Sequence, residues 1–332
     1  MPELRQDPCT KEWVIMARER ARRPDEFVGH TRDAPSDRRT CAFCPGNEHM
    51  TPTDIWRLTT DDQSWRIRVV PNKFPALSPE AGPEHHDGAG LYRRMDGYGR
   101  HEVIVETPDH DQILALAPTE AVRDVLVTFR ERYQALRQDP GVKLVLIFKN
   151  HGPRAGTSME HPHCQIIATP VIPSFIRRKY EVAIQHYDDT GRCIYCDIVR
   201  LEREVRDRVV LESDHFIVFE PYASRSPFET WIAPLHHDSS FGHVKEAQLE
   251  DLARILLQTL LRLHRGLGNP DFNFVVHTAP VEDETKPYYL WHFEITPRLT
   301  TPAGFELGSR ISVNSCLPED AAAFLRSVDV DG

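Results

Sequence analysis

The order of features in the first half of the chain is repeated in the second half. The first half runs "CAFC", "WRIRVVPNKFPAL", "HEVIVETPDHD", an amphipathic segment, "KLVLIFKNHGPRAG" and "EHPHCQIIATP". The second runs "CIYC", "HFIVFEPYASRSPFE", "TWIAPLHHDSSF", another amphipathic segment, "FNFVVHTAPVEDE" and "LWHFEITPRL". Internal similarity constrains a fold more than any single motif. It predicts a duplicated strand-strand-helix-strand-strand unit, with halves at residues 1–185 and 186–332 and a seam at "HYDDTGR".

Apolar periodicity predicts one helix in each unit. Helical spacing relates two sets of residues: Val122, Val125, Leu126, Phe129, Tyr133 and Leu136, and Leu249, Leu252, Leu256, Leu260 and Leu263. Gly266, Gly268 and Pro270 are expected to end the second helix. The other segments are short, rich in Val, Ile, Phe and Trp, and bounded by Pro, Gly or Asn, which is typical of strands. We expect an α+β fold with a mostly antiparallel sheet, and a surface loop at "SPEAGPEHHDGAG".

Two Cys-x-x-Cys pairs occupy matching places in the two halves. Each such turn supplies two zinc ligands, and two more must come from elsewhere. For Cys41 and Cys44 the candidates are His110 and His161; for Cys193 and Cys196 they are His237, or its neighbour His236, and His292. Ordinary cysteines are the alternative, which the repetition disfavours, and a redox role lacks a thioredoxin-like setting. Four protein ligands would leave no position for a catalytic water, so these sites are expected to be structural.

The stretch "MEHPHCQIIATP" places His161, His163 and Gln165 at alternate positions, and therefore on one side of a strand. If His161 binds the metal, His163 is left free beside it. A neutral imidazole is a competent nucleophile toward phosphorus when its other nitrogen donates to a fixed acceptor. The amide of Gln165 is suited to bind a phosphoryl oxygen. The alternative is that both histidines are metal ligands, and spacing alone does not decide between the two.

The same stretch resembles the His-x-His-x-Gln motif of the histidine-triad superfamily, and specifically the galactose-1-phosphate uridylyltransferase family. Members of that family are two fused histidine-triad-like halves. The likeness covers nearly the whole chain, from "ELRQDPCTKEWVIMARERARRP" through "CAFCPGNE", "VVPNKFPAL", "FKNHGPRAGTSMEHPH" and "PFETWIAPLHH" to "HFEITPRL". Ordered matches over this length are far more specific than the short motif.

The resemblance implies a ping-pong reaction. His163 would attack the α-phosphorus of UDP-glucose, release glucose 1-phosphate and form a uridylyl-histidine, from which galactose 1-phosphate takes the uridylyl group. Gln165 would hold the phosphoryl oxygens. Family positions that contact substrate match Arg20, Arg23, Asn72, Asn150, Ser158 and Glu306. The family's first zinc site matches Cys41, Cys44, His110 and His161 one by one.

The chain departs from the family pattern in three places. Cys164 stands where relatives carry Gly or Ser, and its side chain is expected to face away from the reacting phosphorus. A histidine expected at the second zinc site falls on Leu290, so that site either holds Zn or Fe through Cys193, Cys196, His237 and His292, or is empty. In other relatives a different set holds the rear metal, and its members match His277, His292 and Glu294. The segment "FELGSRISVNSCLPED" matches the family's sugar-binding segment only in part, which leaves the sugar open.

Competing functions remain. A phosphorylase acting on an ADP-sugar or a dinucleoside polyphosphate would use the same histidine. A non-enzymatic zinc module that binds nucleotides or nucleic acid is disfavoured, because the net charge is −10 and no basic stripe with interleaved aromatics is present. The apolar runs are strand-sized and the N-terminus is charged, which predicts a cytoplasmic protein without a membrane partner. The resemblance also implies galactose metabolism and a homodimer.

Overall fold

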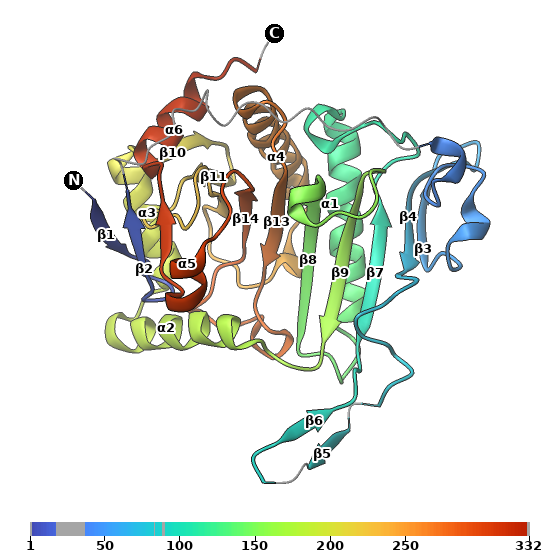
Figure 1. Ribbon diagram of the computed structural model, residues 1–332, viewed down its shortest axis with the longest axis horizontal. Helices are drawn as coiled ribbons and strands as arrows, with labels where there is room; N and C mark the ends of the chain where they lie inside the picture. The colour runs from blue at the N-terminus through green and yellow to red at the C-terminus, as the bar shows by residue number, and fades with distance from the viewer. Residues whose placement is uncertain (1, 18–36, 83, 88–89, 331–332) are drawn as a thin grey trace.

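A ten-stranded sheet forms the centre of the protein (Figure 1). The computed structural model describes residues 2–17, 37–82, 84–87 and 90–330, so Arg20 and Arg23 lie outside the described residues. Neighbouring strands of this sheet are antiparallel throughout. Their order is β10 (Val209–Glu212), β11 (Phe216–Phe219), β12 (Thr230–Pro234), β14 (His292–Pro297), β13 (Phe272–His277), β8 (Leu144–His151), β9 (His163–Thr169), β7 (Arg100–Val105), β4 (Trp65–Pro71) and β3 (Trp56–Thr59).

The sheet has an approximate two-fold symmetry about its centre, where β13 pairs with β8. Outward from that pair, β8-β9-β7-β4-β3 is matched by β13-β14-β12-β11-β10. The register agrees as well. Gln165 is opposite Val103, which is opposite Val70, and Glu294 is opposite Trp231, which is opposite Phe219. The fold is therefore α+β and duplicated as predicted, and the register equates Gln165 with Glu294.

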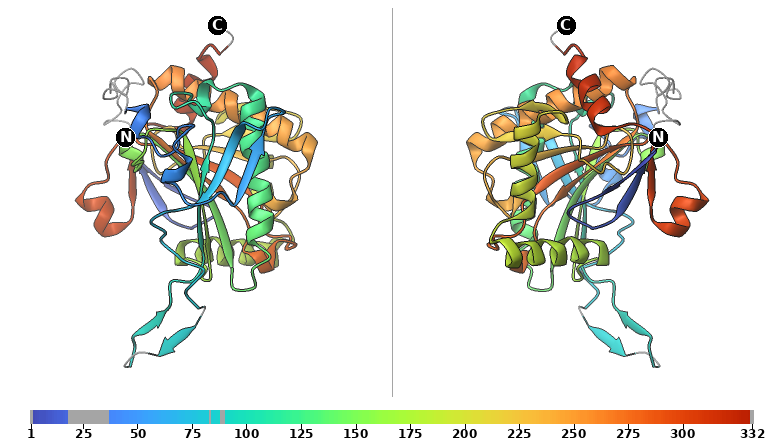
Figure 2. Two further views of the ribbon diagram at one scale, coloured as in Figure 1. Left: turned by 90° about the vertical axis from the view of Figure 1, so that its right-hand side faces the viewer. Right: turned by 90° about the vertical axis from the view of Figure 1, so that its left-hand side faces the viewer.

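Two helices, α1 (Thr119–Leu136) and α4 (Glu246–Leu267), cover one face of the sheet (Figure 2). Their apolar sides enclose the main core, which includes Phe129 and Leu256 together with Cys164 and Ile166 from β9. The helix α4 ends as predicted, because Gly268 adopts a left-handed conformation with φ +68°. The helix α6 (Pro318–Ser327) packs against α4 and β10.

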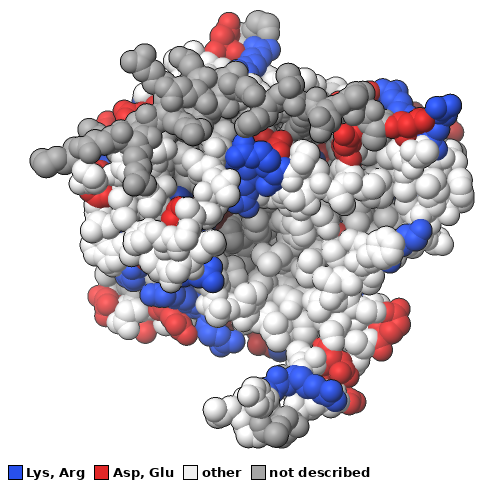
Figure 3. Space-filling view, viewed as in Figure 1, with Lys and Arg blue, Asp and Glu red and all other residues white. Residues whose placement is uncertain are grey.

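On the opposite face of the sheet, helices form a second core over the strands of the second half. In the second half, α2 (Ser174–Thr190) and α3 (Ile194–Val205) contribute to a second core with Trp231 and Tyr289. A small sheet of β1 (Glu3–Gln6), β2 (Trp13–Met16) and β15 (Ser312–Asn314) and the helix α5 (Gly304–Ser309) complete this side. A space-filling view of this face shows a hollow near its centre with lysine and arginine residues above it (Figure 3).

Two expectations for connecting segments were wrong in part. The first five residues of "HYDDTGR" belong to α2, and the chain leaves the helix only at Gly191, φ +70°. The expected surface loop contains β5 (His85–Asp87), which pairs with β6 (Arg93–Met95) in a projecting hairpin (Figure 1). Short 3-10 helices are η3 (Arg38–Thr40), η4 (Glu48–Met50), η5 (Leu114–Leu116), η6 (Pro153–Ala155), η7 (Phe241–His243) and η8 (Val281–Asp283). None of the helices in the described ranges has the length and apolarity needed to cross a bilayer.

Candidate metal and nucleophile sites

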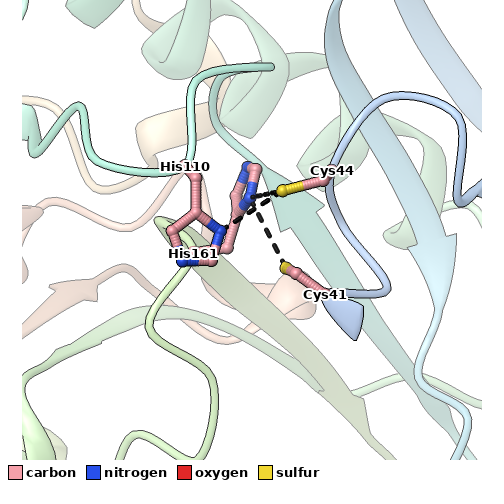
Figure 4. Close-up of side chains that lie close together, drawn as sticks. All are labelled: Cys41, Cys44, His110 and His161. Atoms are coloured by element: carbon pink, nitrogen blue, oxygen red, sulfur yellow. Dashed lines mark hydrogen bonds between the residues drawn. The ribbon is translucent and has the colours of Figure 1, made fainter. Parts of the chain in front are cut away.

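Cys41, Cys44, His110 and His161 converge at one point beside β9 (Figure 4). All four are buried, and their ligand atoms lie within 4.8 Å of one another. The Sγ of Cys44 is 3.3 Å from Nδ1 of His110 and 3.5 Å from Nδ1 of His161, which is 3.7 Å from the Sγ of Cys41. Tetrahedral zinc with bonds of about 2.0–2.3 Å separates its ligand atoms by about 3.3–3.8 Å. The cluster therefore fits a zinc ion.

Hydrogen bonds fix the ring of His161 for this task. Its Nε2 lies 2.8 Å from the carbonyl oxygen of Thr107. A carbonyl only accepts, so Nε2 carries the proton and Nδ1 keeps the lone pair that faces the cysteines. Burial lowers the pKa of His161 to about 4, so the ring is neutral near pH 7. The Cys41–Cys44 turn is held by Asn47, whose amide donates to the carbonyl of Cys41 at 2.8 Å.

The ring of His163 presents the other nitrogen. Its Nδ1 lies 2.9 Å from the carbonyl oxygen of His161, so Nδ1 carries the proton and Nε2 keeps a lone pair. Burial lowers the pKa of His163 below its usual value, which favours the neutral ring. His163 is 7% exposed and lines a cavity of about 450 Å³ together with Asn150, Thr157 and Arg298. An imidazole held in this way is suited to attack an electrophile bound in the cavity.

Gln165 is oriented by His101, a residue to which no role could be assigned from the sequence. The backbone N–H of Ala76 donates to Nδ1 of His101 at 3.1 Å, so the proton of that ring is on Nε2. This nitrogen lies 2.8 Å from Oε1 of Gln165 and donates to it. The NH₂ group of Gln165 is therefore the end left to donate to a ligand. His101 is in β7 and Gln165 is in the neighbouring strand β9. The sequence contains no local pattern that predicts the pairing of these two strands.

A buried ion pair of Lys149 and Glu106 lies on the side of β9 opposite to the side chains of His163 and Gln165. Nζ of Lys149 is 2.5 Å from Oε1 of Glu106 and 3.3 Å from the carbonyl oxygen of His163. The thiol of Cys164 donates to the same Glu106 oxygen at 2.8 Å. Lys149 and Glu106 are 2% and 5% exposed. Cys164 packs in the core under α1 and α4, so its side chain faces away from Nε2 of His163, as expected.

The structure separates the remaining predicted substrate residues. Asn150 lines the cavity, and its Oδ1 accepts from the amide of Asn273 at 2.7 Å. Ser158 is exposed between two residues that line the cavity. Asn72 does not line it but lies 3.1 Å from the ring of His101. Glu306 is also absent from the lining, and its carboxylate accepts the backbone N–H groups of Ala303, just before α5, and of Val313 in β15.

In the second half, Cys193, Cys196 and His237 come together, with their ligand atoms within 4.8 Å of one another. Hydrogen bonds from Cys196 and His237 lower the pKa of Cys193 to about 5, which favours the thiolate that binds metal. The structure does not bring His292 to this group. Its Nδ1 lies 3.0 Å from the carbonyl oxygen of Leu290, and its ring stacks 4.4 Å from Trp231.

The register explains the position of His292. Because Glu294 corresponds to Gln165, His292 corresponds to His163, and Leu290 corresponds to the candidate ligand His161. The alternative set His277, His292 and Glu294 also has a competing arrangement, since Glu294 pairs with Arg225 and lies 3.7 Å from Nζ of the buried Lys179. Two cations beside the one carboxylate disfavour a divalent ion there.

Comparisons with known proteins agree with this geometry. The family model "Galactose-1-phosphate uridyl transferase, N-terminal domain" matches residues 1–173, and the corresponding C-terminal domain model matches residues 177–328. An ADP-glucose phosphorylase of Arabidopsis thaliana is 33% identical over 99% of this chain and 93% of its own. A galactose-1-phosphate uridylyltransferase of Thermotoga maritima is 28% identical over the full length of both chains.

Solved structures show the same relationship. The crystal structure of an ADP-glucose phosphorylase from Arabidopsis thaliana with bound ADP-glucose superimposes with a TM-score of 0.85, at 31% identity and 99% coverage of both chains. A structure of uridylyltransferase gives a TM-score of 0.77, at 28% identity and 98% coverage of both chains. The two domain models together span nearly the whole chain, which therefore belongs to the galactose-1-phosphate uridyl transferase family.

Proposed function

We propose that this enzyme transfers a nucleoside monophosphate from a nucleoside diphosphate sugar by way of a covalent bond to His163. The leading reaction moves UMP from UDP-glucose to galactose 1-phosphate. The observation that carries the proposal is the bond from Nδ1 of His163 to the His161 carbonyl, which leaves Nε2 as the reactive nitrogen at a cavity of about 450 Å³. Membership of the family supports the reaction class.

In the first step, Nε2 of His163 forms a bond to the α-phosphorus, and the bond from that phosphorus to the bridging oxygen breaks. The bridging oxygen leaves with glucose 1-phosphate. In the second step, a phosphate oxygen of galactose 1-phosphate attacks the same phosphorus and the N–P bond breaks. In both steps the proton stays on Nδ1 of His163, which donates its hydrogen bond to the His161 carbonyl. The amide of Gln165, held by His101, donates to a non-bridging oxygen as charge develops there.

The metal acts as a support in this proposal. Zinc held by Cys41, Cys44, His110 and His161 would fix the segment from which His163 projects. The rear group of Cys193, Cys196 and His237 is proposed to hold zinc or iron, because two thiolates and an imidazole suit soft and borderline metals. His292 is not part of that proposed ligand set, since its ring nitrogens do not lie with the ligand atoms of the group.

Substrate recognition is assigned to the remaining family positions. Arg20, Arg23, Asn150 and Ser158 are proposed to bind the phosphates, and Asn72 the region of the base. Glu306 is proposed to serve the sugar site of a partner subunit in a homodimer, a role compatible with its position on the exposed helix α5 and outside the cavity of its own chain. The division into halves at residues 185 and 186, a cytoplasmic location and a role in galactose metabolism complete the proposal.

A second candidate is phosphorolysis of ADP-glucose, with inorganic phosphate as the acceptor. It is favoured by the 33% identity to an ADP-glucose phosphorylase and by the TM-score of 0.85, against 0.77 for a uridylyltransferase. Both candidates use the same first-step chemistry at His163. They differ in the base and in the acceptor, and a dinucleoside polyphosphate is a further donor of the same class.

A four-arm assay separates the candidates. UDP-glucose or ADP-glucose is supplied with galactose 1-phosphate or with phosphate, and the nucleotide products are quantified. The leading proposal expects UDP-galactose from UDP-glucose and galactose 1-phosphate. Formation of ADP from ADP-glucose and phosphate, with no product in the other arms, would reject it in favour of the second candidate. The variant His163→Asn, near in size but not nucleophilic, is expected to be inactive in every arm.

A further inference from the structure

We propose that the rear cluster is an open metal site, in which Cys193, Cys196 and His237 supply three ligands and the fourth position accepts a small exogenous donor such as water, cyanide or imidazole. The inference rests on the proposed metal binding and goes beyond it. It makes the two metal sites of the duplicated fold chemically different, one closed and one reactive.

The first step of the argument is geometric. The Sγ of Cys196 lies 3.3 Å from Nδ1 of His237, and the Sγ of Cys44 lies 3.3 Å from Nδ1 of His110. The two-fold relation of the sheet thus preserves three ligands of the first site in the second half. A distance of 3.3 Å is the edge expected between two ligands of one tetrahedral ion.

The second step concerns the missing ligand. The position that corresponds to His161 is Leu290, which is 1% exposed and lies in the same apolar cluster as Cys193 and Cys196. A leucine side chain has no atom that binds metal. Two nearby donors lie outside this group: Nδ1 of His292 donates to the Leu290 carbonyl while its Nε2 is buried without a hydrogen-bond partner, and Asp197 pairs with His186, Arg192 and Arg200. Within the described ranges, the group has three members and not four.

The third step concerns access. Every ligand of the first site is buried, whereas at the rear site Cys196 is partly exposed and His237 is exposed. Two thiolates and one imidazole without a fourth protein ligand form the kind of ligand set with which zinc binds a water or a substrate. A metal at the rear site is therefore expected to exchange ligands, and to be lost to chelators sooner than the metal of the first site.

Metal release and optical spectra test this proposal on the full-length protein. Zinc release to the chelating dye 4-(2-pyridylazo)resorcinol is followed in the native protein, and two phases are expected, the faster one absent in His237→Ala. The site emptied in the fast phase is then refilled with Co²⁺. Its visible d–d bands are expected to shift when cyanide or imidazole is added, because the added donor takes the fourth position.

The variant Leu290→His supplies the ligand that the second half lacks, and Leu290→Asn is a control of similar size that binds zinc poorly. In Leu290→His, release is expected to slow by about tenfold or more and the Co²⁺ bands to become insensitive to added donors, while Leu290→Asn behaves as the native chain does. Co²⁺ bands that ignore added donors in the native protein, or a single zinc per chain that His237→Ala leaves unchanged, would overturn the inference. Neither result touches transfer through His163, which the four-arm assay measures independently.

Discussion

His161 and His163 are two positions apart, yet they present different ring nitrogens. His161 donates from Nε2 to the Thr107 carbonyl, and His163 donates from Nδ1 to the His161 carbonyl. Strand alternation predicts that the two rings share a side, but spacing leaves open whether both bind metal. The distinction depends on Thr107, which is 54 residues away in sequence. Such a contact is outside the reach of a local pattern, and so is the bond from His101 to Gln165.

The contact between His101 and Gln165 gives the first prediction. His101→Phe removes the donor that orients the Gln165 amide, so kcat is expected to fall by about 10–100-fold with little change in KM. If His101 acts only through Gln165, the double variant with Gln165→Ala is no slower than Gln165→Ala alone. Steady-state kinetics of the three variants completes the cycle. Losses that simply add would show that His101 has no positioning role.

At the scale of elements, polar contacts on the core side of the sheet hold the strand β9 that carries His163. Lys149 of β8 and Glu106, which follows β7, meet on the core side of β9, and Lys149 also binds the His163 carbonyl. The helices α1 and α4 could be predicted because their apolar spacing is regular. The helices α2, α3, α5 and α6 were not predicted, and the polar "HYDDT" that ends α2 resembles a seam between the halves more than a helix. The group of Cys193, Cys196 and His237 could be predicted from the sequence, but the position of His292 outside it could not, because alternation along a strand does not reveal whether Leu290 or His292 faces the cysteines.

The buried pair gives the second prediction. Lys149→Met leaves the Glu106 carboxylate buried without its cation, which is expected to reduce the free energy of unfolding by about 3–5 kcal/mol. The double variant Lys149→Met with Glu106→Gln removes both charges and is expected to recover most of that loss. Urea unfolding of the native protein and both variants measures it. A double variant less stable than the single would contradict the account of a paired charge.

At the scale of the whole molecule, the duplication joins two halves whose corresponding histidines have different surroundings. The first half brings together four residues that could hold a metal ion, and a histidine that lines a cavity. In the second half, the ring of the corresponding His292 is covered by Trp231 at 4.4 Å. The repeated order of segments predicted this architecture. The different surroundings of His163 and His292 could not be predicted from order alone, because they depend on which side chains the register places together.

The first metal site is expected to stabilise the whole fold, since metal binding free energy is partly folding free energy. Cys41→Ser is predicted to remove one zinc per chain and to lower the free energy of unfolding by on the order of 2–5 kcal/mol. Cys316→Ser, at a partly exposed cysteine outside both clusters, serves as the matched control and should change neither quantity. Metal analysis with thermal unfolding provides the measurement. Equal stability of the two variants would be inconsistent with a structural ion.

Acid sensitivity is expected from the second half. Burial lowers the pKa of His277 from 6.5 to about 4, so between these values the unfolded chain binds a proton that the native chain does not. The free energy of unfolding is therefore highest above pH 6.5, and it is expected to fall by about 1.4 kcal/mol for each pH unit as the pH is lowered from 6.5 toward 4. His277→Phe should make the stability profile shallower in this window, whereas His49→Gln, at an exposed histidine, should not. Parallel profiles for all three proteins would contradict the prediction.

The central claim is that the Nε2 of His163 forms a bond to phosphorus. It is tested most directly by mixing the protein with UDP-glucose, and in parallel ADP-glucose, labelled in the α-phosphate, without an acceptor, and then mapping the label on the denatured chain. The account predicts acid-labile label in the peptide that contains His163, approaching one equivalent per chain, and its loss in His163→Asn. Turnover without any labelled protein, or label on another residue, would contradict it.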